Sequence, residues 1–102
     1  MTGADGFVGR WLVRAARAAG HHVVAAIAPD GVEPASWLTP DELAGCEMVR
    51  ADLRDPSGIA ALAQSAPTAV VHLAAMASGA AARLDPAAAW ALNAGATAAL
   101  AD

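Results

Sequence analysis

Three glycines near the start of the chain have the spacing of a loop that can hold an anion. Gly3, Gly6 and Gly9 form G-x-x-G-x-x-G, and helical periodicity begins at Phe7. In such a loop the first glycine allows a tight turn, the second lets a diphosphate approach the backbone, and the third lets the helix pack closely. The free N–H groups of the helix's first turn then face the anion. Glycine turns without a ligand share this spacing, but the helix and strands after the loop favour diphosphate binding.

Few other residues have the type and spacing of metal ligands, disulfide partners or catalytic groups. His21 and His22 have no cysteine or carboxylate at ligand spacing beside them, so we expect no metal site. His72 lies in an apolar run and is expected to be a core histidine whose hydrogen bonds are satisfied. Cys46, the only cysteine, cannot form an internal disulfide, which favours a reducing cytoplasm. Tyrosine and lysine are absent from the chain, and we name no catalytic residue.

Composition limits the possible partners. A chain of 102 residues is one domain or a piece of one. Its net charge is −4 and it has no basic block, so nucleic acid and anionic membranes are not expected partners. We find no signal peptide and no apolar run near the roughly 18 residues that suggest a membrane span.

The glycine loop leads into a predicted helix over residues 7–19. Gly20 stands where a glycine commonly ends a helix. We expect the core face to consist of Phe7, Trp11, Leu12, Ala15 and Ala19. The opposite, solvated face is expected to carry Arg10, Arg14 and Arg17.

Two further helices are predicted after the pairs Asp55-Pro56 and Asp85-Pro86, because Asp is a good N-cap and Pro suits the first helical position. The first has Ile59, Leu62, Ala63 and Ala66 at helical spacing and stops before Pro67. The second runs to the C-terminus with Trp90, Ala94, Thr97 and Ala101 on one stripe.

Short apolar runs predict the strands. Val23–Ile27 and Ala69–Leu73 are typical of strands buried on both faces, and the alternating run Glu47–Leu53 suggests a strand nearer a sheet edge. Residues 28–45 form a long connection with one helical turn from Pro40 to Ala44. The order of elements predicts an α/β fold with a parallel sheet, in which the strands at Val23 and Ala69 flank the strand that ends at Thr2.

Four stretches together resemble the extended short-chain dehydrogenase/reductase family, the NAD-dependent epimerases and dehydratases. They are "TGADGFVG", "ADLRD" (Ala51 to Asp55), "VVHLAA" (Val70 to Ala75) and "DPAAAWALNAGAT" (Asp85 to Thr97), in the family's order. The resemblance covers the whole chain but only about the first third of a family member. It implies a partial Rossmann-type, doubly wound sheet over residues 1–102, with the first strand truncated and the C-terminal half absent.

The resemblance also assigns a site for NAD or NADP. Phe7 and Val8 would lie under the diphosphate, and the Asp52 carboxylate would accept from the adenine amino group. Asn93 would brace the floor of the active site or touch the cofactor, and a structural role is equally open. The full implied set is Gly3, Gly6, Phe7, Val8, Gly9, Asp52, Leu53, Leu73, Ala74, Ala75 and Asn93.

Two departures from the family pattern affect the choice of cofactor and the expected catalysis. The family usually ends its second strand with an acid for the ribose hydroxyls or with basic residues for a 2′-phosphate, but here that place is Ile27, and Asp30 comes three residues later. The absence of an acid at Ile27 slightly favours NADP, and the choice between NAD and NADP stays open. The family's Tyr/Lys proton-transfer pair is also absent, so we expect an N-terminal fragment without turnover of its own.

For the intact protein the resemblance implies hydride transfer at C4 of a nucleotide sugar. The sequence around Asn93 looks most like reductases and dehydratases of GDP-linked 6-deoxysugars, which implies a cytoplasmic homodimer. The alternatives are a non-catalytic dinucleotide-binding regulatory module, or a small α/β domain without a ligand. A Tyr-x-x-x-Lys motif beyond Asp102 would favour the enzyme.

Overall fold

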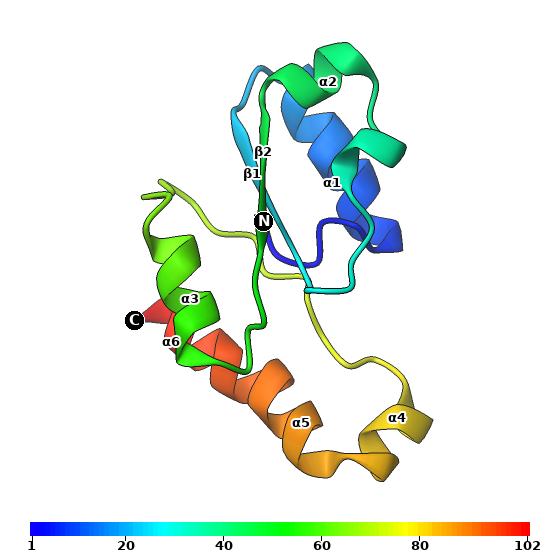
Figure 1. The fold of residues 1–102 in the computed structure, drawn as a ribbon, viewed down its shortest axis with the longest axis vertical. Coiled ribbons are helices and arrows are strands. Elements are labelled where there is room, and N and C mark those ends of the chain that lie inside the picture. Colours follow the sequence, from blue (N-terminus) through cyan, green and yellow to red (C-terminus); the bar gives the residue numbers. More distant parts are fainter.

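The computed structural model describes all residues from 1 to 102, and it places helices on both sides of a small parallel sheet (Figure 1). Its strands are β1 (Val23–Ile27) and β2 (Cys46–Arg50). The helices are α1 (Phe7–Ala18), α2 (Pro40–Ala44), α3 (Pro56–Ala63), α4 (Gly79–Leu84), α5 (Pro86–Trp90) and α6 (Ala96–Ala101). A 3₁₀ turn covers Pro34–Ser36, and a π-helical turn, Ala91–Gly95, joins α5 to α6.

The sheet has the predicted parallel order. β1 pairs with β2 from Val23↔Cys46 to Ile27↔Arg50. Thr2 forms single parallel bridges to Ala26 on one side and to His72 on the other. The β1 strand and the segment at His72 therefore flank Thr2, as predicted, and β2 lies at an edge.

The prediction of a strand over Ala69–Leu73 is wrong, because this run forms only a single bridge, at His72. A ladder needs successive pairings, and of the neighbouring segment only Thr2 pairs with this run. Val70 and Val71 are consequently exposed rather than buried on both faces. The strand predicted over Glu47–Leu53 begins at Cys46 and ends at Arg50.

Helix α1 forms nearly where predicted, but its faces are reversed. Gly9 and Val13 are its buried residues, whereas Phe7 is 83% exposed and Trp11 is 65% exposed. The arginine row is half-buried because it packs against α2 and the segment that precedes it. Arg10 lies 5.5 Å from the Trp37 ring, Arg14 donates to the Trp37 carbonyl, and Arg17 donates to the Glu42 carbonyl at 3.0 Å.

Both Asp-Pro pairs begin helices as predicted. Asp55 accepts from the N–H of Ser57, and Asp85 accepts from the N–H of Ala88. The C-terminal segment differs from the prediction in two ways, since α4 precedes it and a π-helical turn interrupts it. Its inner face is Leu92, Ala96 and Leu100 rather than the predicted stripe, and Trp90 is exposed.

The core consists of two apolar clusters on opposite sides of the sheet. One joins α1 and the 34–44 connection to β1, around Val13, Ile27 and Trp37. The other joins α3 and α6 to the sheet, around Ala26, Leu62 and Ala96. This arrangement leaves the carboxyl ends of the strands uncovered, and the candidate site lies there. No helix in the fold has the length and apolar character needed to cross a membrane.

Candidate functional site

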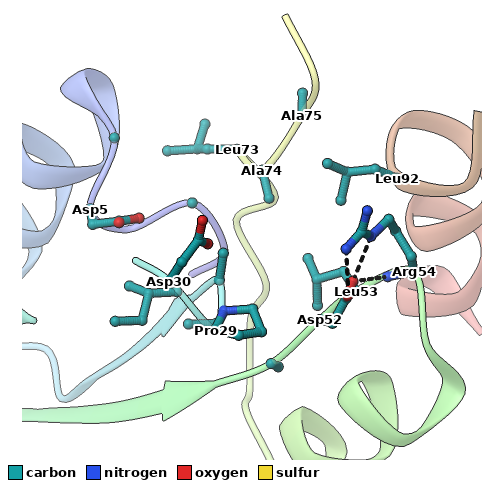
Figure 2. Close-up of a pocket in the computed structure, with 16 residues that line it drawn as sticks. Asp5, Pro29, Asp30, Asp52, Leu53, Arg54, Leu73, Ala74, Ala75 and Leu92 are labelled. Carbon is teal, nitrogen blue, oxygen red and sulfur yellow. Dashed lines mark hydrogen bonds and ion pairs between the residues drawn. The ribbon is translucent and has the colours of Figure 1, made fainter. Parts of the chain in front are cut away.

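A cleft of about 350 Å³ opens where the parallel segments end (Figure 2). The ends of β1 and β2 form one wall, and the glycine loop and the segment after His72 form the other. Chain order reverses here, because the segment after β2 and α3 returns to the far side of Thr2. A parallel α/β sheet typically binds ligands in the crevice at such a switch point.

Close backbone packing explains two of the three loop glycines. Gly3 has φ +63°, and a Cβ atom there would lie 2.8 Å from the backbone nitrogen of Ala74. A side chain on Gly9 would overlap the carbonyl oxygen of Gly3. Gly6 has more space, since its nearest atom, the Gly3 oxygen, would be 3.3 Å from a Cβ atom. Gly3 and Gly9 thus shape the loop, and Gly6 leaves the backbone open toward the cleft.

The first turn of α1 offers unpaired backbone donors beside this loop. Gly6 is its N-cap and supplies no side-chain acceptor, and the turn contains no acidic residue. The N–H groups of Phe7 and Val8 have no acceptor within the protein. The helix dipole adds partial positive charge at the same point, so this turn suits a negatively charged group. The side chains of both residues point to solvent and do not line the cleft.

At the far end of the cleft, Asp52 and Arg54 form an ion pair (Figure 2). Arg54 donates from Nε to Oδ1 at 2.9 Å and from Nη2 to Oδ2 at 2.6 Å. Its backbone N–H also donates to Oδ1. These hydrogen bonds lower the pKa of Asp52 to about 2, so the carboxylate is ionised at neutral pH.

The loop after β1 carries an acid into the cleft from a position that sequence reasoning set aside. Asp30 lines the cleft, and its carboxylate takes part in no hydrogen bond or ion pair within the protein. The loop is held on two sides. Arg50 Nη1 donates to the carbonyls of Pro29 and Gly31, both at 3.0 Å, and the N–H of Val32 donates to Asp5 at 2.8 Å. The backbone on either side of Asp30 is therefore held, and the Asp30 carboxylate is available as an acceptor.

Asn93 lies outside the cleft and holds a neighbouring segment. Its Oδ1 accepts from the backbone N–H of Met76 at 2.7 Å, and its Nδ2 donates to the Met76 carbonyl at 3.2 Å. The π-helical turn that contains Asn93 places this amide against the chain just beyond Ala75. Asn93 therefore holds the backbone at Met76, and its role toward a cofactor stays a prediction.

Seven of the predicted site residues line the cleft, and four do not. The seven are Gly3, Gly6, Asp52, Leu53, Leu73, Ala74 and Ala75. Those outside its lining are Phe7, Val8, Gly9 and Asn93. Further lining residues not predicted from the sequence include Asp5, Asp30, Arg54 and Leu92. No group of three or more His, Cys, Asp or Glu residues has the geometry of a metal site.

One supporting residue that sequence reasoning missed is Gly58, on α3. A Cβ atom at Gly58 would overlap the carbonyl oxygen of Asp52, so the helix touches the turn that carries this wall of the cleft. The available signal was a glycine inside a helical pattern, which commonly marks close packing.

Comparisons with known proteins agree with this geometry. The family model described as "NAD dependent epimerase/dehydratase family" matches residues 1–102. A crystal structure of a presumed epimerase from Burkholderia cenocepacia J2315 is similar, with 37% sequence identity and a TM-score of 0.73. The match covers 97% of this chain and 29% of that chain. No curated protein matches the chain.

Proposed function

Because this chain belongs to the NAD-dependent epimerase/dehydratase family, we propose that its cleft binds the dinucleotide of an enzyme that modifies nucleotide sugars. The family implies NAD(P) as the cofactor. The single observation that supports this location best is the pair of unpaired N–H groups on Phe7 and Val8, beside Gly6 at the cleft's edge.

The residues of the cleft fit the parts of a dinucleotide. The first turn of α1 would hold the diphosphate, since its N–H groups and dipole favour an anion. Leu53 and Leu92 supply apolar surface at the end that would receive the adenine, with the ion pair of Asp52 and Arg54 beside them (Figure 2). The small side chains of Ala74 and Ala75 leave room for the nicotinamide end.

The charges of the cleft favour NAD over NADP. Asp30 is the one carboxylate that lines the cleft without a hydrogen-bond donor from the protein, because Asp5 accepts from Val32 and Asp52 from Arg54. A free carboxylate can accept from ribose hydroxyls and repels a 2′-phosphate. The only guanidinium that lines the cleft is already paired with Asp52. Asp30 thus supplies the acid that Ile27 lacks, which reverses the slight lean toward NADP.

The reaction itself is a proposal about a longer protein, because the chain spans 29% of the length of its structural neighbour. The bound cofactor would supply hydride exchange at C4 of a nucleotide sugar, with GDP-linked 6-deoxysugars as the first substrates to test. We expect a homodimer in the cytoplasm. Residues 1–102 contain no Tyr or Lys, so the expected proton-transfer pair does not come from them.

Calorimetric titration with NAD and NADP tests this proposal. We expect NAD to bind more tightly, and the variant Gly6→Val to abolish binding, because its side chain would occupy the space needed by the diphosphate. Gly79→Val is the matched control, since a Cβ atom there meets only the end of Arg83 at 3.6 Å and Gly79 lies outside the cleft. Equal binding by the unmodified protein and Gly6→Val would refute the assignment of the loop.

A further inference from the structure

The Thr2 side chain joins two segments beneath the cleft. Thr2 is 1% exposed, and its hydroxyl oxygen accepts from the backbone N–H groups of Leu73 at 3.1 Å and Ala74 at 3.2 Å. These two residues line the cleft. The same oxygen lies 2.6 Å from Nδ1 of His72.

The hydrogen bonds that the Thr2 hydroxyl oxygen accepts determine which neighbour receives its proton. A threonine hydroxyl has one proton and two lone pairs. Both lone pairs already face backbone donors, so the proton is available only to Nδ1 of His72. That nitrogen must therefore be an acceptor, and the neutral imidazole carries its proton on Nε2. Burial lowers the pKa of His72, which also favours the neutral ring.

We propose that His72 is a positioning residue for the dinucleotide site. By accepting the Thr2 proton, His72 turns the hydroxyl oxygen toward the N–H groups of Leu73 and Ala74 and holds them at the floor of the cleft. This floor touches the glycine loop, since a Cβ atom on Gly3 would lie 2.8 Å from the Ala74 nitrogen. A displaced floor would therefore also disturb the loop. The identity of the ligand rests on the proposed function, whereas the hydrogen-bonded arrangement does not.

The arrangement is tested first without a ligand. Nitrogen-15 NMR of the unmodified protein should show His72 with an unprotonated, hydrogen-bonded Nδ1. The Ala74 amide should exchange with solvent about tenfold faster in His72→Phe, the change expected for the loss of one net hydrogen bond. His21→Phe is the matched control, because His21 is exposed, and it should leave this exchange unchanged. A proton on Nδ1, or an unchanged Ala74 exchange rate in His72→Phe, would overturn the proposal.

A second pair of variants separates positioning from folding and from the choice of ligand. Thr2→Ser keeps the hydroxyl and should bind NAD within about twofold of the unmodified protein, whereas Thr2→Val should weaken binding by roughly five- to tenfold. Equal affinities for these two variants would overturn the positioning role. If the unmodified protein binds no dinucleotide, the proposed function fails, and the NMR and exchange results still decide whether His72 and Thr2 hold Leu73 and Ala74 in place.

Discussion

Asp52 and Arg54 hold each other through two side-chain hydrogen bonds, of 2.9 and 2.6 Å, at one end of the cleft. Only one residue separates them in the sequence, and the backbone N–H of Arg54 also donates to Asp52. The turn after β2 thus fixes the carboxylate before any ligand arrives. Its orientation toward a ligand depends on this local pair.

The first prediction concerns the titration of Asp52. In Arg54→Gln we expect the pKa of Asp52 to rise from about 2 toward its ordinary value of 3.8, because its main hydrogen bonds are lost. In the unmodified protein the pKa of Asp52 is lower in the folded state than in the unfolded state. The contribution of the Asp52–Arg54 pair to the free energy of unfolding is therefore complete above pH 3.8 and is lost as pH falls through about 2. Carboxyl carbon-13 NMR titration measures both proteins. An Asp52 titration that does not change in the variant would contradict the assigned cause.

The second prediction concerns the contact between α3 and the Asp52 turn. A Gly→Ala change inside a helix usually stabilises by up to about 1 kcal/mol. Gly58→Ala should instead destabilise the protein by about 1–3 kcal/mol, because the added methyl group overlaps the carbonyl of Asp52. Urea unfolding measures whether Gly58→Ala raises or lowers the free energy of unfolding. Gly95→Ala is the control, since its Cβ atom would meet only the Trp90 oxygen at 3.9 Å, and it should be neutral or stabilising.

The third prediction concerns the choice of cofactor. Asp30→Asn should weaken NAD binding by about 10- to 100-fold, the range for a hydrogen bond to a charged group. NADP binding should fall less or rise, because the variant removes a negative charge from the place where a 2′-phosphate would lie. Titrations with both cofactors measure the ratio, and Asp41→Asn on α2, outside the cleft, is the control. A ratio that stays constant in Asp30→Asn would exclude Asp30 as the selecting residue.

The fourth prediction is that residues 1–102 alone show no turnover. Hydride transfer at a sugar carbon needs a group that moves the hydroxyl proton, and general acid–base help is typically worth 10²–10⁴-fold. The chain has no Tyr or Lys, and His72 is engaged with Thr2. The absorbance of NAD(P)H, followed with a panel of nucleotide 4-ketosugars, measures turnover. Activity that survives repurification would show that a residue interpreted as structural is catalytic.

Local features were predictable from the sequence because their causes lie within a few residues. The glycine loop, the Asp caps of α3 and α5, and the helix end at Gly20, with φ +86°, each depend on adjacent backbone groups. The parallel order around Thr2 was also predictable from the succession of elements, since crossover connections have a fixed hand.

The faces of α1 required the tertiary structure. Phe7 and Trp11 have the apolar character of core residues, but the core lies against the side with Gly9 and Val13. Which side is covered depends on the path of the 34–44 connection, whose carbonyl groups accept from the half-buried arginine row. Periodicity finds the faces of a helix, but it does not say which of them another segment covers.

The site divides in the same way. Sequence spacing predicted that the glycine loop holds an anion, and the family resemblance implied the roles of Asp52 and of Leu73 to Ala75. The tertiary structure decided that Asp30 enters the cleft and that the Thr2 hydroxyl meets His72. Thr2 and His72 are 70 residues apart, and Asp30 reaches the cleft through a loop held by Arg50. Such contacts form only when the parallel segments align, so no local pattern in the sequence specifies them.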